Sequence, residues 1–183
     1  MLNKSVICLS LIIITSFLAA PALCLDAYQR ARQAMEQYSA AQLHWQSNLA
    51  ELVSTKNQSF ADLAIIQRNL QLSLISLRNE RFQYLLQKDP KRLTLDKGIS
   101  KLANFEWSDK DSKTLSMQSP SYAKREKRTE ELERTNNAQA EWPEFRIFFR
   151  ESLANTPQYK KLLDELLEAQ KVASELLNQG QQE

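Results

Sequence analysis

The residues best suited to binding form a short aromatic group with arginines beside it in the C-terminal part of the chain. This group consists of Trp142, Phe145, Arg146, Phe148, Phe149 and Arg150. Positions 145, 148 and 149 share one side of a helix, because helical side chains three and four residues apart are neighbours. Aromatic rings next to arginine are common where proteins bind one another, but hydrophobic cores use such rings as well. The group therefore has two interpretations, a core plug or a surface for a partner or ligand.

Catalytic and metal-binding chemistry has little support elsewhere in the chain. His44 is the only histidine, and a metal site usually gathers several histidine or cysteine ligands. Two glycines are too few for the loops that cradle phosphates. Asp164 and Glu168 are one helical turn apart, but catalysis by paired carboxylates needs a sheltered cleft, and these stand between lysines on a face expected to be wet. We therefore expect no catalytic residue, no metal site and no cofactor.

The charges nearly cancel, with 24 lysines and arginines against 22 acidic residues. Nucleic-acid binding depends on an excess of basic groups at phosphates, so no nucleic-acid partner is expected. The expected partner is a protein, either a second copy of the chain or another protein of the cell envelope.

The N-terminus resembles an export signal in its physical pattern. Lys4 precedes an almost wholly apolar run over residues 6–20, about 15 residues, whereas a membrane-spanning helix needs roughly 20. Pro21 is expected to break the helix, and the small-x-small pattern of residues 20–22 suits a signal peptidase. We therefore expect residues 1–24 to be a signal peptide that is cleaved near Ala22 or Cys24.

Cleavage would export the chain, most simply to a bacterial periplasm, and would leave no stable membrane span. Two alternatives stay open: a lipid anchor on Cys24, against which the bulky Leu23 argues, and an uncleaved N-terminal anchor. Residues 25–183 would then form a single domain of about 160 residues. The scarcity of glycine, which tight turns need, favours an all-α domain.

The first expected helix carries apolar residues at every third or fourth position from Tyr28 onward. The series, here called the seam, includes Met35, Tyr38, Gln42, Trp45, Leu49 and Leu52. Such a series forms one continuous stripe along a helix. The stripe either faces the core of one chain or forms a self-associating coiled coil, in which the lone polar Gln42 would fix the register.

A second apolar series from Phe60 to Tyr84 predicts a second helix, with Ser59 and Asp62 as its cap. Residues 54–58 are then a hairpin loop, although a single helix over residues 27–88 is the alternative. Pro90 is expected to end this helix, because the residue before a proline disfavours helical geometry.

Residues 89–121 are expected to be a mobile connection that holds one short helix near Ile99. Within it, residues 108–121 are the strongest candidate for a loop. Ser119 and Pro120 then open a third helix, which is highly charged and suited to ion pairs within itself. Pro143 and Pro157 begin a short helix and a last long one. These patterns predict an all-α fold, an antiparallel bundle or coiled-coil-like hairpin of about four helices.

Two functional hypotheses follow from these observations. The first is an exported, non-catalytic helical interaction protein of the cell envelope that acts as a scaffold, adaptor or chaperone-like binder. The alternative is a helical bundle that binds or senses a small hydrophobic ligand, in a pocket near residues 142–149 and Trp45.

Overall fold

The computed structural model describes the backbone of residues 12–179 and the side chains of residues 27–179. Within this range the chain is all-α, as expected, and has no strand. The helices are α1 (Ile12–Lys56), α2 (Ala61–Lys88), α3 (Gly98–Leu102), α4 (Asp109–Gln118), α5 (Pro120–Asn137), α6 (Trp142–Glu151) and α7 (Pro157–Asn178). Short 3-10 helices occupy Gln58–Phe60, Pro90–Arg92 and Leu153–Asn155.

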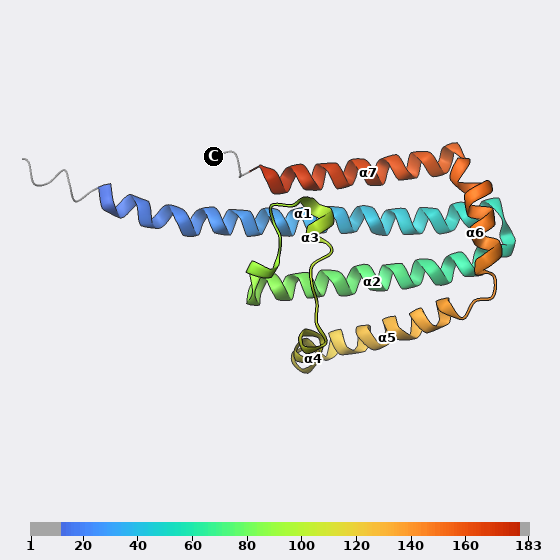
Figure 1. Ribbon diagram of the computed structural model, residues 1–183, viewed down its shortest axis with the longest axis horizontal. Helices are drawn as coiled ribbons and strands as arrows, with labels where there is room; N and C mark the ends of the chain where they lie inside the picture. The colour runs from blue at the N-terminus through green and yellow to red at the C-terminus, as the bar shows by residue number, and fades with distance from the viewer. Residues whose placement is uncertain (1–11, 180–183) are drawn as a thin grey trace, which may run out of the picture.

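The four long helices lie side by side in the order α7, α1, α2, α5 (Figure 1). Helix α1 packs against both α7 and α2, and α2 packs against α5. Neighbours in this series run antiparallel. The result is an open layer in which α1 and α2 separate the two outer helices.

Helix α6 crosses this layer at one end, and the short helix α3 lies on it toward the other end (Figure 1). Helix α3 packs on α7 and α1, where its Ile99 joins a cluster with Met35 of the seam. The aromatic rings of α6 pack beside Leu49 of the same stripe. Positions 35 and 49 are two heptads apart, so both helices lie on one face of α1. We call this side of the layer the α3–α6 face.

A hairpin joins α1 to α2, so the chain does not form one long rod over residues 27–88. Helix α1 ends at Lys56, and Asn57 has extended backbone geometry. The side chain of Asn57 accepts hydrogen bonds from the Ser59 amide at 3.1 Å and from the Ser59 hydroxyl at 2.7 Å. Ser59 was therefore the wrong cap, because it supplies donors to Asn57. Helix α2 ends before Pro90, as predicted.

The expected break at Pro21 is wrong, because α1 continues through this residue. An internal proline removes one helical hydrogen bond and costs about 3 kcal/mol, which can kink a helix without ending it. The positive start of the expected signal, residues 1–11, lies outside the described residues, as do the side chains at its two cleavage positions, Ala22 and Cys24. Across the part of the chain that is described, no helix has the length and apolar character that a bilayer crossing requires.

The connection between α2 and α5 contains two helices, one where a short helix was expected and one where a loop was expected. Helix α3 matches the predicted short helix, and α4 occupies most of residues 108–121. The Ser108 side chain accepts from the Asp111 amide, and Asp111 accepts from the Ser108 amide in return, which completes a capping box. Asp111 also accepts two hydrogen bonds from Arg92, at 3.0 and 2.9 Å. The bonds of Asp111 thus stabilise α4, although its sequence is too polar to predict a helix from apolar spacing.

Candidate functional site: the central cleft

The core of the protein consists of two hydrophobic clusters, one at each end of the layer. The first lies under α3 and includes the buried side chains of Met35 and Phe82. The second lies under α6 and includes Phe60 and Val53. Between these clusters α1 and α2 carry polar side chains such as Gln42 and Arg78 beside the buried apolar side chains of Ile75 and Leu77.

A cleft opens in this region on the α3–α6 face, with a volume of about 230 Å³. Helix α1 supplies its floor, α2 supplies one wall, and one leucine of α7 supplies the other. We call it the central cleft, and its lining residues are Gln42, Trp45, Gln46, Gln71, Leu74, Ile75, Arg78 and Leu166. Three amides, one guanidinium and several apolar side chains therefore share one opening.

Arg78 is the only charged residue among those that line the central cleft. Its guanidinium donates to the Gln42 side-chain oxygen and, at 3.4 Å, to the Ser39 hydroxyl. It also lies 5.9 Å from the centre of the Tyr38 ring. Neighbouring Ser39 donates to Asn79 at 2.8 Å, which holds α1 and α2 together at this level. Arg78 is thus positioned by neutral groups.

No carboxylate within the described part of the chain pairs with Arg78. Two nearby arginines show the contrast: Arg81 of α2 contacts Glu126 at 3.1 Å, and Arg125 of α5 contacts Glu80 of α2 at 2.6 Å. The Nε atom of Arg78 is buried without a hydrogen-bond partner. Burial lowers the pKa of the guanidinium, and the nearby Tyr38 only partly opposes this effect. A half-buried cation without a counter-ion is costly, so its presence at an opening needs an explanation.

The seam residues are covered within one chain. Met35 and Tyr38 are buried beneath α3, and Trp45 makes an edge-on contact with Tyr159 of α7. Leu49 and Leu52 pack against the second cluster. Within one chain the seam residues thus face α3, α7 and the second cluster. Gln42 accepts the hydrogen bond of Arg78.

The aromatic group of α6 forms the lid of the second cluster. Phe60 contacts the rings of Phe145 and Phe148 at 5.5 and 5.2 Å, and Phe149 contacts Tyr159 edge-on at 5.3 Å. Trp142 donates its indole N–H to the Asn136 carbonyl at 2.7 Å. The structure therefore favours the core-plug interpretation of these rings.

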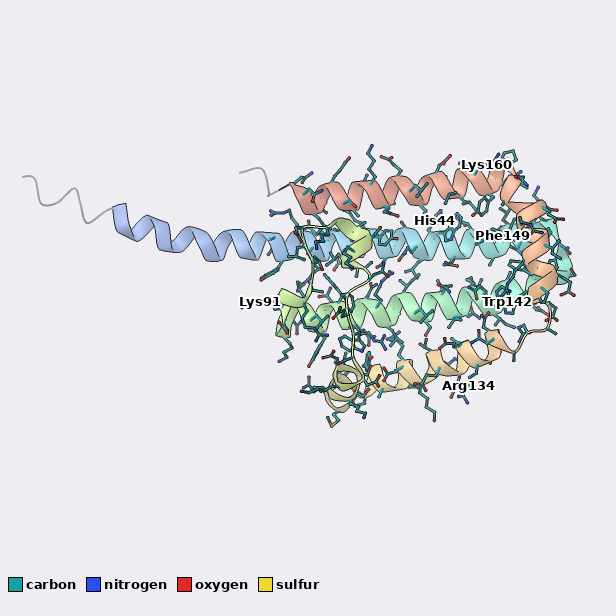
Figure 2. All side chains as sticks on the ribbon, viewed as in Figure 1. His44, Lys91, Arg134, Trp142, Phe149 and Lys160 are labelled. Carbon is teal, nitrogen blue, oxygen red and sulfur yellow. The ribbon has the colours of Figure 1, made fainter. Side chains whose placement is uncertain are left out.

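The polar members of the same group point outward. Arg146 and Arg150 are exposed, and Arg150 contacts Glu151 at 2.9 Å. Figure 2 shows that Trp142 and Phe149 sit at the end of the layer. The cleft beneath the α6 aromatics has a volume of only about 30 Å³, room for about one water molecule. This end of the molecule therefore offers little space for the small hydrophobic ligand of the alternative hypothesis.

The lone histidine lies on the opposite side of α1 from the central cleft. His44 accompanies Glu51, Lys161 and Glu165 in a hollow of about 480 Å³ between α1 and α7. Lysines and carboxylates are both present there, so the hollow balances its own charge. His44, which is labelled in Figure 2, contacts Asn48 at 2.7 Å. The described residues contain no group of three histidine, cysteine or acidic side chains placed to hold a metal ion.

Helix α5 is tied to its neighbours more closely than its charged sequence indicated. Tyr122 is fully buried; it accepts from Arg81 at 2.9 Å and donates to Glu126 at 2.8 Å. Burial would raise the pKa of Glu126, but the hydrogen bonds led by that from Tyr122 outweigh it and hold the pKa below its usual value. The expected pairs inside α5 are thus replaced in part by pairs with α2, because Arg81 and Glu80 lie opposite.

Arg78 was missed by the sequence analysis. It falls outside both apolar series, and its neighbours come from three helices that sequence spacing alone does not bring together. The one sequence feature that could have indicated the cleft is the polar Gln42 within the otherwise apolar seam, because Gln42 lines the cleft.

Comparison with known proteins gives no relative for this chain. No protein-family model matches it, and no curated protein or solved structure is significantly similar to it. The functional argument therefore depends on the geometry of the α3–α6 face.

Proposed function

We propose that this chain is an exported, non-catalytic helical interaction protein of the cell envelope, a scaffold, adaptor or chaperone-like binder, and that it binds its partner on the α3–α6 face. The export half of the proposal rests on the N-terminal pattern of a charge, an apolar run and a small-x-small site. N-terminal sequencing of the protein from the host envelope tests it, because an intact start at Met1 in every fraction would contradict export with cleavage.

The binding half of the proposal rests on one observation, the unpaired Arg78 inside the central cleft. Both ends of the same face are covered by α3 and α6, yet the middle is open and polar. The rim also exposes an apolar side chain, since Leu74 is 40% exposed.

Site-specific photo-crosslinking in host cells tests the binding surface. A photoreactive phenylalanine derivative replaces Leu74 at the cleft rim, and a matched variant carries it in place of His44 on the opposite side of α1. Both positions are exposed, so neither replacement disturbs a core. We expect discrete higher-mass adducts from position 74 and none of comparable yield from position 44. Equal yields, or no adduct from position 74, would contradict the proposal.

A further inference from the structure

The surroundings of Arg78 indicate which chemical group the partner presents to the central cleft. The Arg78 guanidinium is held at the cleft by the neutral side chains of Gln42 and Ser39, and no carboxylate lines the cleft. The guanidinium fork matches the two oxygens of a carboxylate better than any other common group in a protein. An acidic side chain from outside the chain would therefore complete this site.

The surroundings of Arg78 define what must flank that carboxylate. Leu74, Ile75 and Leu166 line the same cleft, and Trp45 adds an aromatic surface. The amides of Gln42, Gln46 and Gln71 can exchange hydrogen bonds with a backbone. A segment with an acidic residue between aliphatic residues would satisfy both the apolar and the polar parts of this lining.

The size and continuity of the cleft favour a protein segment over a free small molecule. The volume of about 230 Å³ is below the usual range of small-molecule sites, about 300–1,000 Å³. Gln46 also lines the small cleft beneath α6, so the two clefts adjoin along the α1–α2 groove. The joined groove carries two arginines, Arg78 in the central cleft and Arg68 in the small one, and no carboxylate lines either. An elongated groove of this kind suits a chain segment.

We propose that the central cleft is the docking site for an acidic residue, flanked by aliphatic residues, in a segment of a partner protein, with Arg78 as its carboxylate receptor. This inference deepens the proposed function and rests on it. The site thereby acquires its counter-ion only in the complex.

The test compares the photo-crosslinked adduct from position 74 in chains that differ at one arginine. Arg78→Met removes the guanidinium and keeps an unbranched side chain. Arg78→Lys keeps the positive charge but loses the two parallel N–H donors. Arg81→Met is the matched control, because Arg81 is paired with Glu126 within the chain. We expect Arg78→Met to reduce the adduct at least about tenfold, since truncating one partner of a desolvated charge pair is costly. Arg78→Lys should retain part of the yield, and Arg81→Met, once shown to be folded by circular dichroism, should retain most of it.

Sequencing of the crosslinked peptide provides the second readout. The inference predicts an aspartate or glutamate among aliphatic residues close to the crosslinked position, and exchange of that acid for its amide should lower the yield as Arg78→Met does. An adduct that is unaffected by Arg78→Met would overturn the inference while leaving the proposed function in place. No adduct at all from position 74 would instead contradict the proposed function.

A free carboxylate is the competing occupant, and octanoate is its probe. Titration of octanoate into the purified full chain, followed by amide resonances, should shift residues 42, 46, 71 and 78 only weakly and at millimolar concentration. Saturation at micromolar concentration, lost in Arg78→Met, would overturn the assignment to a partner segment and identify the cleft as a small-acid site.

Discussion

The hydroxyl of Tyr122 accepts a hydrogen bond from Arg81 of α2 and donates one to Glu126 of α5. The ring itself is fully buried, so water cannot replace either bond if the hydroxyl is lost. Arg81 also lies 5.3 Å from the centre of the Trp107 ring, which adds the connection before α4 to the same group. At the residue scale, this network joins α2, α5 and the segment before α4 through hydrogen bonds as well as ring contacts.

Replacing Tyr122 by phenylalanine should lower the free energy of unfolding by about 1–2 kcal/mol, the usual effect of leaving buried hydrogen-bonding groups unpaired. Urea denaturation measures this change. The control is Tyr84→Phe, because Tyr84 is half-buried beside Trp107 and its hydroxyl has no partner among the described residues. A control effect as large as that of Tyr122→Phe would contradict the importance of the network.

At the element scale, α4 depends on a single carboxylate. Asp111 completes the capping box of Ser108 and accepts both hydrogen bonds of the Arg92 fork. The hydrogen bond from Arg92 is the main reason that the pKa of Asp111 lies well below its ordinary value of 3.8. A carboxyl whose pKa is lower in the folded state stabilises that state above its ordinary pKa, and this contribution is lost as the pH falls through the folded value.

Asp111→Asn should therefore lower the free energy of unfolding at pH 7 by about 1–2 kcal/mol, because both a cap and an ion pair are lost. The difference from the native chain should shrink progressively as the pH is lowered below about 4, where the unfolded carboxyl takes up a proton. Denaturation at a series of pH values checks both statements. A difference that stays constant down to pH 2 would show that the charge of Asp111 is unimportant.

Helix α6 is held by its aromatic face and presents a polar one. Phe60→Ala removes the ring that contacts both Phe145 and Phe148, and should cost about 3–4 kcal/mol of stability. Ile147→Ala on the exposed side of α6 should change stability by less than about 0.5 kcal/mol, since Ile147 is 50% exposed. Thermal unfolding compares the two variants. A small effect of Phe60→Ala would return the aromatic group to the status of a candidate binding surface.

At the scale of the whole molecule, apolar periodicity predicted the long helices well. The 3–4 spacing from Tyr28 to Leu52 does lie in α1, and Pro90, Pro120 and Pro157 mark real helix boundaries. The open layer could not be predicted in the same way. It depends on how α3 and α6 pack on the long helices. Helix α4 was not predicted because its sequence is mostly polar; the capping box of Ser108 and the hydrogen bonds from Arg92 stabilise it.

The two clusters at the ends of the layer explain why the middle can include polar side chains. They supply much of the apolar burial that holds α1, α2 and α7 together. Ser39, Gln42 and Arg78 place hydrogen-bonding groups between them, beside Tyr38 of the first cluster. We therefore propose that Arg78, unlike the residues of the two clusters, serves binding and not the stability of the layer.

Urea denaturation of Arg78→Met and Arg81→Met tests most directly whether Arg78 serves binding and not stability. The comparison requires no knowledge of the partner. Arg81 is paired within the chain, so Arg81→Met should lower the free energy of unfolding by about 1–3 kcal/mol. Arg78 is a half-buried charge without a counter-ion, so Arg78→Met should leave stability within about 0.5 kcal/mol or raise it. An equal loss of stability in both variants would contradict the account, because Arg78 would then serve the fold and not a partner.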